Sequence, residues 1–437
     1  MPTANVASPA VLPPANALAA VVHPNPYPYY QSLASQRPFD FDVSLGMWVA
    51  AGPQALAAVL RHPACGVRPV GARVPAALAN GAAGDWFGAL VRMNDGSAHA
   101  AMKPWIKARL ATLHADGATL ARLHDASQAA CADAYLACGD SPTARLDDFV
   151  FRQPIYALAA WLGVAPPQWA DVFDDVRKLV AAMAESAKPS PRADVLARGH
   201  SAASTLRARA MRWLDNDAVS GTWLHDTARS AARDDAIDYS VLTANVVGLF
   251  TQAHDACAGL VANSLRRLSQ HEQHEQHEQH KQHAQHEQYG EAERNALPTP
   301  RPLATGRAML PANLAVAISA VNEVIRHDPP IQNTRRFLHA PAVIGERTLA
   351  RGDAILVVLA ATPAATPAGA SPDDVAWTFG HGAHACPGRS PASTIAALGV
   401  QAILDSGVEF SCVTHGTAYH PLGNVRIARF QGDAATS

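Results

Sequence analysis

The chain has few charged residues and no excess of either sign. Charged side chains make up 16% of its 437 residues, with 35 Lys and Arg against 37 Asp and Glu. A typical globular protein has about 25% charged residues. A dedicated nucleic-acid binder would carry a clustered basic excess, so we expect no nucleic-acid partner. Hydrophobic residues, at 49%, are abundant enough for a large core and exclude a wholly disordered protein.

Cysteines and long apolar runs are scarce as well. Six cysteines without a Cys-x-x-Cys pair are too few for a disulfide scaffold. No apolar run reaches the roughly 18 uninterrupted residues of a membrane helix. Arg37 is the first basic residue other than histidine, so the N-terminus lacks the charged start of a secretory signal and the arginines of a transit peptide. We therefore predict a cytoplasmic protein with no membrane partner.

The apolar pattern predicts a mainly α-helical protein with small β-sheets. Residues 1–22 are rich in Ala and Pro and are expected to form a flexible leader. Strands are few and fall near the two ends of the chain, at 41–52, 332–345 and 353–360. Apolar residues recur at helical spacing in most of the rest. The expected helices are 54–61, 117–138, 147–163, 168–185, 194–214, 236–268 and 311–327.

A low-complexity insertion at 270–290 interrupts this pattern. It consists mostly of a His-Glu-Gln repeat that has one alanine and otherwise no aliphatic side chain, so it cannot bury a core. We expect either a solvated helical extension or a disordered linker. Histidines recur every three residues, which suggests metal binding, but a period of three drifts around a helix and presents no fixed face of ligands.

The segment 377–407 is the most informative for chemistry, because a Gly-rich loop there leads into a helix. Cys386 lies just before the expected helix N-terminus, where backbone N–H groups and the helix dipole stabilise a thiolate. Three interpretations are open: a buried structural cysteine, a zinc site with His381 and His384, and a haem-thiolate ligand.

The same loop resembles the haem-binding segment of cytochromes P450. The family pattern is Phe-x-x-Gly-x-His-x-Cys-x-Gly, and its fixed positions are matched by Phe379, Gly382, His384, Cys386 and Gly388. The resemblance implies that Cys386 is the axial ligand of a haem iron and that the cofactor is haem b (iron protoporphyrin IX). Phe379 and Gly388 would then belong to the haem-binding loop.

Further segments match the same family. Glu323 and Arg326 form its Glu-x-x-Arg motif on the expected helix 311–327, where residues i and i+3 share a face and can pair. The family's His-x-x-x-Arg segment corresponds to His99 and Lys103, with lysine in place of arginine, which loses the bidentate fork.

The resemblance gives four residues a shared role at the edge of the haem. It implies that His99, Lys103, Arg336 and His384 contact the haem propionates. The match covers residues from about 23 to 430, and the His-Glu-Gln repeat lies outside it.

Two departures from the family concern its oxygen-activating helix and the segment before the cysteine loop. The helix motif corresponds here to 252–257: the acid is present as Asp255, but Ala256 replaces the proton-delivering threonine and Gln252 replaces a small residue. Without that hydroxyl, a substrate hydroxyl, a water held by Gln252 or Asp255, or hydrogen peroxide in place of O₂ would be needed. Residues 360–380 hold no arginine, so the pair Glu323–Arg326 is expected to lack the family's third partner.

The resemblance implies a single P450 domain over 23–437 and a monooxygenase that inserts one oxygen atom from O₂ into a small organic substrate in specialised metabolism. Electrons would come from NAD(P)H through a ferredoxin reductase and a ferredoxin. The substrate would lie between 236–268, a loop at 66–91 containing Trp86 and Phe87, and the helices of 168–214, although these aromatics could equally be core. Two alternatives stay open: atypical haem-thiolate chemistry (peroxide-driven oxidation, rearrangement or oxidative coupling), motivated by Ala256, and a non-catalytic haem sensor.

Overall fold

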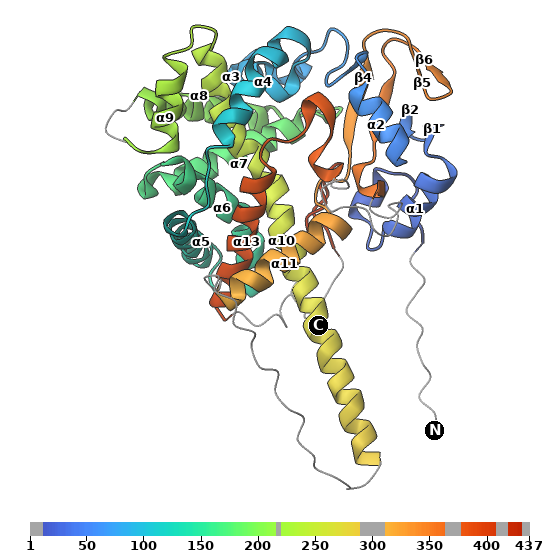
Figure 1. Ribbon diagram of the computed structural model, residues 1–437, viewed down its shortest axis with the longest axis vertical. Coiled ribbons are helices and arrows are strands. Elements are labelled where there is room, and N and C mark those ends of the chain that lie inside the picture. Colours follow the sequence, from blue (N-terminus) through green and yellow to red (C-terminus); the bar gives the residue numbers. More distant parts are fainter. Residues whose placement is uncertain (1–11, 216–219, 289–310, 363–376, 408–417, 431–437) are drawn as a thin grey trace.

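The computed structural model describes residues 12–215, 220–288, 311–362, 377–407 and 418–430, with only the backbone of 272–288. Within these ranges a helical body carries a smaller β-region on one side (Figure 1). The helices are α1 (Tyr27–Gln36), α2 (Pro53–Arg61), α3 (Ala82–Ala89), α4 (Gly96–Leu110), α5 (Gly117–Cys138), α6 (Pro142–Leu162), α7 (Trp169–Glu185), α8 (Ala193–Asp215), α9 (Trp223–Ala231), α10 (Tyr239–Gln288), α11 (Ala312–His327) and α13 (Arg389–Asp405).

The main sheet joins the two ends of the sequence. Its order is β1-β2-β7-β4-β3, and β2 and β7 are parallel whereas the other pairs are antiparallel. The strands β5 and β6 form a separate hairpin. This arrangement agrees with the expectation of few strands near both ends. The strands are β1 (Phe39–Asp42), β2 (Met47–Ala50), β3 (Cys65–Gly66), β4 (Thr334–Leu338), β5 (Ala342–Ile344), β6 (Arg347–Leu349) and β7 (Ala354–Val357).

The segment 41–52 was expected to be one strand, but the structure has a hairpin there. The carboxylate of Asp42 accepts hydrogen bonds from the Ser44 backbone N–H at 2.9 Å and the Ser44 hydroxyl at 2.7 Å. Gly46 then has φ +62°, a left-handed conformation that glycine adopts without steric cost. These turn residues reverse the chain inside a segment whose composition otherwise favours a strand.

Helix α10 is the axis of the helical body. It packs against α6, α7, α8, α11 and α13, and its residues Leu260, Val261 and Leu265 are buried in the main core. Burial of each such side chain contributes about 1.5–3 kcal/mol. The helix then continues through the His-Glu-Gln repeat to Gln288 and projects away from the body (Figure 1). Of the two interpretations of the repeat, the helical extension is therefore the one that the backbone adopts up to that residue.

Three further expectations need correction. Ala17, Ala20 and Val21 pack in the core beside α1, so the leader expected over 1–22 does not include them. The loop expected at 66–91 contains helix α3, and helices α4 and α9 lie in segments for which no helix was expected. Helix α3 was missed because its eight residues include two glycines, and α4 because its apolar periodicity is weak.

Candidate functional site

The cysteine loop comprises two short 3₁₀ turns, Trp377–Phe379 and Gly382–His384, before α13. The backbone N–H of Cys386 donates to the carbonyl of Phe379 at 2.7 Å, which closes the loop. Gly382 has φ +70°, and a Cβ atom there would lie 3.0 Å from the carbonyl oxygen of Leu60 in α2. Glycine is thus required at this position both by its conformation and by its neighbour.

Cys386 is an accessible side chain in a crowded part of the protein. Its thiol is exposed, although the protein atoms around it are close enough for burial to dominate its pKa. Burial raises the pKa of the Cys386 thiol, while the Gly388 N–H, 3.4 Å from Sγ, and the charges of Lys103 and Arg92 act to lower it. The expected N–H donor to the sulfur is therefore present, but without a metal ion the effect of burial dominates.

Two histidine rings lie together beside the cysteine loop. The rings of His99 on α4 and His384 in the loop are 4.2 Å apart between centroids. His384 Nε2 donates to Asp95 Oδ1 at 3.0 Å, and Asp95 Oδ2 accepts from the Val67 N–H at 2.9 Å. His99 Nε2 is buried and has no hydrogen-bond partner within the described part of the chain. Burial, His384 and Lys103 together lower the pKa of His99 to about 4.

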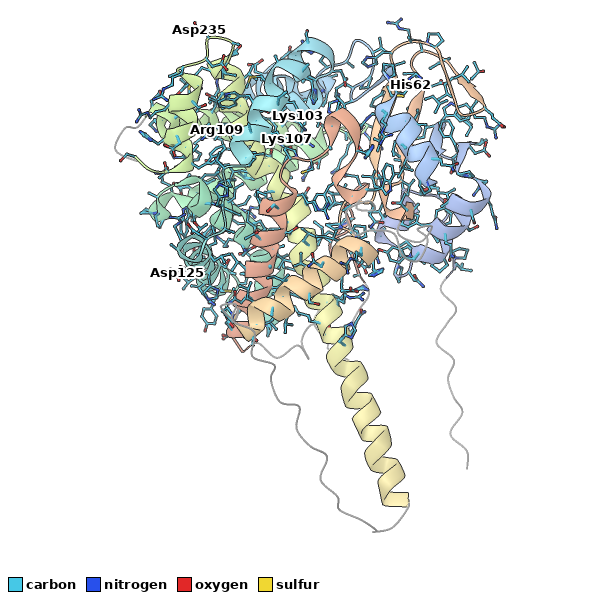
Figure 2. All side chains as sticks on the ribbon, in the orientation of Figure 1. His62, Lys103, Lys107, Arg109, Asp125 and Asp235 are labelled. Atoms are coloured by element: carbon cyan, nitrogen blue, oxygen red, sulfur yellow. The ribbon has the colours of Figure 1, made fainter. Side chains whose placement is uncertain are left out.

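Three further cations approach the same region. Lys103 lies on α4 one turn before Lys107, and burial lowers its pKa (Figure 2). Arg336 on β4 is buried, and its guanidinium donates to the carbonyl of Arg335 at 2.8 Å and to Thr334 Oγ1 at 3.3 Å. The third cation, Arg92, lies on the 3₁₀ turn Val91–Met93 and was not expected from the sequence.

Arg92 resembles Cys386 in its surroundings. Its side chain has accessible surface within an enclosure of protein atoms, and the charges of Cys386 and Asp255 act on it. Burial lowers the pKa of Arg92 to about 10. Within the described part of the chain the Arg92 guanidinium makes no hydrogen bond or ion pair, and Cys386 and Asp255 act on it only through their charges.

These residues fit a haem. The accessible thiol of Cys386 offers a ligand for the iron. The haem's two carboxylates would find an excess of donors in the unpartnered Nε2 of His99 and the cations Lys103, Arg336 and Arg92. The roles expected for His99, Lys103, Arg336, His384, Phe379 and Gly388 stay predictions. The structure adds that His384 is engaged by Asp95 and that Phe379 lies under the Arg389 guanidinium, 5.5 Å from its ring centroid.

The zinc interpretation of the loop has no support in the geometry. His381 Nε2 accepts from Arg61 Nε at 2.8 Å, and His384 is bonded to Asp95, so both rings have other partners. Among the residues that the structure describes, no group of three His, Cys, Asp or Glu side chains is arranged to hold a metal ion. The side chains of the repeat beyond His271 lie outside the described residues, and so does the metal binding considered for the repeat.

The expected oxygen-activating segment lies on α10. Asp255 is partly exposed and Ala256 is half-buried. The Gln252 amide donates to the carbonyl of Gly248 at 2.8 Å, so it is engaged within its own helix. Asp255 Oδ1 lies 2.8 Å from Nδ1 of the buried His254. The sequence analysis had not singled out His254.

Glu323 has a third partner that the sequence did not suggest. Its Oε1 lies 3.4 Å from Arg326 Nη1, as the motif predicts, and its Oε2 lies 2.9 Å from Nη2 of Arg267 on α10. His327 Nε2 is 3.6 Å from the same Oε2. The expectation that the pair lacks the family's third partner concerns 360–380, most of which lies outside the described residues, and it stays a prediction. Glu323 nevertheless has a further arginine partner, supplied by α10.

The aromatic residues expected beside a substrate are core residues. Trp86 and Phe87 are almost fully buried on α3, and Trp86 Nε1 donates to the Ala244 carbonyl on α10 at 3.0 Å. Arg68 lies over the Phe87 ring, 5.1 Å from its centroid. Of the two interpretations considered, ordinary packing accounts for both side chains.

The comparison with solved structures decides the fold. P450BioI, in complex with an acyl carrier protein ligated to hexadec-9Z-enoic acid, matches with a TM-score of 0.64 at 17% identity, covering 92% of this chain and 96% of that one. Epothilone B-bound cytochrome P450epoK matches with a TM-score of 0.63 at 16% identity, covering 94% and 95%.

Cytochrome P450 CREJ, in complex with (4-ethylphenyl) dihydrogen phosphate, matches with a TM-score of 0.65 at 16% identity, covering 93% and 96%. The chain has the cytochrome P450 fold. The fold predicted from the cysteine loop and the Glu-x-x-Arg motif is therefore confirmed. No family model matches the sequence, and no curated protein does. No helix in the described ranges has both the length and the apolar character needed to cross a bilayer.

Three residues that lie beside the expected site residues were not expected from the sequence. They are Arg92, His254 next to Asp255, and Arg267, which the whole insertion separates from Glu323. The position of His254 next to the motif acid was a signal in the sequence. Arg267 gave none, because only the packing of α10 on α11 brings it to Glu323.

Proposed function

We propose that the chain is a haem-thiolate monooxygenase that inserts one oxygen atom from O₂ into a small organic substrate, in the cytoplasm. The observation that carries the proposal is the accessible Cys386 thiol, which the loop holds within reach of the charges of Lys103 and Arg92 in a P450 fold. The cofactor would be haem b, with Cys386 as the ligand of its iron. Bound there, it would supply the activation of O₂, which thiolate donation favours.

The protein's own residues would bind and orient this group. His99 Nε2 and the cations Lys103, Arg336 and Arg92 would bind its two carboxylates, which offsets the free energy of burying these cations. The network around Glu323 would fix α11 against α10 behind the loop. The partly exposed carboxylate of Asp255 on α10 would hold a proton.

Electrons would come from NAD(P)H through a ferredoxin reductase and a ferredoxin. Both partners would be separate proteins. The molecules bound in the structural neighbours range from an acyl chain on a carrier protein to epothilone B and an aryl phosphate. This range supports a small organic substrate, within specialised metabolism, and favours no single compound class.

Ala256 favours a second candidate, in which the same centre performs a peroxide-driven oxidation, a rearrangement or an oxidative coupling. The hydroxyl that normally holds the proton-delivering water in the family is absent at this position. The two candidates differ in their oxidant. They share the cofactor, its ligand and the cavity.

Turnover under ¹⁸O₂ separates these candidates. The holoenzyme is supplied with NAD(P)H, a ferredoxin reductase and a ferredoxin, and in a parallel reaction with hydrogen peroxide alone. We expect one ¹⁸O atom per product molecule in the first reaction. Product formed only with peroxide, or product without labelled oxygen, would contradict the monooxygenase proposal and favour the alternative. Cys386→Ser serves as the control for haem-thiolate chemistry in both reactions.

A further inference from the structure

His254 and Asp255 form a contact that helix geometry does not provide by itself. The His254 Nδ1 atom lies 2.8 Å from Asp255 Oδ1. Side chains at i and i+1 project about 100° apart around a helix and do not normally face each other. The two side chains must therefore both turn toward one another, and something must hold the imidazole in that orientation.

Aromatic rings hold it. The imidazole of His254 is stacked on Phe151 of α6, with ring centroids 5.1 Å apart at an interplanar angle of 29°. On α7, Phe173 lies parallel to it at 6.4 Å and 21°. His420 packs edge-on against Phe151, with ring centroids 5.1 Å apart. His254 is only 5% exposed, and the two phenylalanines from α6 and α7 fix the plane of its ring.

The hydrogen bonding of His254 is one-sided. Its Nε2 is buried without a partner in the described part of the chain, whereas Nδ1 faces the carboxylate. In a neutral imidazole one nitrogen donates and the other accepts, and a bare Nε2 is the less costly atom to bury unbonded. The geometry therefore requires the Nδ1–H form, with Nδ1 donating to Asp255 Oδ1.

We propose that His254 is a positioning residue that fixes the Asp255 carboxylate through Nδ1–H and so sustains proton delivery in a chain that has Ala256 where the family has a threonine. With Oδ1 held by His254, Oδ2 is the oxygen left to hold and release a proton. Asp255 retains 28% side-chain exposure, so water has access to its carboxylate. This inference rests on the proposed monooxygenase function.

The reaction balance defines what is measured. Coupled turnover consumes one O₂, one substrate, two electrons from NAD(P)H and two protons, and yields hydroxylated product and water. If the second proton fails to arrive in place, the same two electrons and two protons leave with O₂ as hydrogen peroxide. The peroxide released per NAD(P)H consumed therefore reports proton delivery directly.

Other charges lie around the dyad but do not replace it. Arg152 and Arg177 are stacked on Phe173, with their guanidinium carbons 4.5 Å and 6.0 Å from the ring centroid. The charges of Arg92 and Asp255 interact, without a hydrogen bond or ion pair between the two side chains. Asp147 lies 3.8 Å from Nε2 of His420, behind Phe151. His254 is the residue whose hydrogen bond to the Asp255 side chain is recorded.

Two substitutions separate hydrogen bonding from packing. His254→Phe keeps an aromatic ring in contact with Phe151 and Phe173 but removes the Nδ1–H that donates to Asp255. His254→Asn loses the ring but places an amide N–H where Nδ1–H was. We expect His254→Phe to lower product per NAD(P)H about tenfold, with a matching rise in peroxide, which is less than the roughly 10²–10⁴-fold effect of a lost general acid because Asp255 remains. His254→Asn should recover most of the coupling.

A double-variant cycle tests whether His254 acts through Asp255. Once Asp255→Asn has removed the acid, adding His254→Phe should change the coupling no further, because residues that act as a unit are not additive. Full additivity would overturn the inference. A second readout is the ¹⁵N spectrum of histidine-labelled holoenzyme in the diamagnetic ferrous carbon monoxide form, where we expect protonated Nδ1 and bare Nε2 for His254. The opposite tautomer would also overturn it.

The outcomes distinguish this inference from the proposed function. If the wild-type holoenzyme gives no labelled product, the proposed function itself fails before the variants are compared. If the wild type is coupled and His254→Phe is equally coupled, only the role of His254 fails. If His254→Asn is as uncoupled as His254→Phe while both keep the wild-type melting temperature and haem content, the ring matters for packing and the hydrogen-bond role is refuted.

Discussion

Arg267 is predicted to stabilise Glu323 more than the motif's own Arg326 does. The Arg267 guanidinium lies 2.9 Å from Glu323 and its side chain is 33% exposed, against 3.4 Å and 48% for Arg326. Exposed pairs contribute about 0.2–1 kcal/mol because solvent screens them. The shorter distance and lower exposure place Arg267 near the upper end, about 1 kcal/mol, and Arg326 near the lower end, about 0.3 kcal/mol.

Double-mutant cycles measure these two coupling energies separately. The variants are Glu323→Gln, Arg267→Gln and Arg326→Gln with the two corresponding double variants, because glutamine keeps the chain length and removes the charge. Urea unfolding of the holoprotein, followed by circular dichroism, gives each apparent free energy. The coupling with Arg267 should also fall at high salt. A coupling for Arg326 equal to or above that for Arg267 would refute the assignment of α10 as the main partner of Glu323.

Two further predictions concern the loop and α4. Gly382→Ala should lower haem retention more than the matched control Gly46→Ala. Both glycines have φ above +60°, but only at Gly382 would an added Cβ lie 3.0 Å from a carbonyl oxygen, that of Leu60. Equal effects would show that the contact with Leu60 is unimportant. For His99, a folded-state pKa of about 4, below the ordinary 6.5, means that the unfolded state binds the extra proton, so the haem-free protein should lose stability as the pH falls from 6.5 to 4. His99→Gln should flatten the free energy of unfolding, measured in urea, between pH 6.5 and 4. An unchanged slope would show that His99 does not cause the loss of stability.

The cysteine loop and most of the long helices could be predicted because their signals are local. The loop has fixed residues at fixed spacing, and α5, α7 and α8 have apolar residues at helical periods between clear breakers. The fold followed from those motifs. The hairpin at 39–50 was missed because its turn depends on one aspartate side chain and one glycine conformation rather than on hydrophobic pattern.

The missing parts of the site depend on contacts between distant segments. Arg267 is brought to Glu323 only by the packing of α10 on α11. The role inferred for His254 depends on two phenylalanines from α6 and α7 that lie nearly parallel to its ring, and the motif itself does not contain them. Arg92 is notable only because the surrounding protein encloses it without an anion. Such features follow from three-dimensional packing, and no spacing rule predicts them.

The absorbance of the dithionite-reduced protein with and without carbon monoxide tests the central claim most directly. If Cys386 binds a haem iron as a thiolate, the carbon monoxide form will show a strongly red-shifted Soret band, and Cys386→Ser will abolish it. A haem spectrum without that shift would contradict thiolate ligation by Cys386. A protein that binds no haem would contradict the account as a whole.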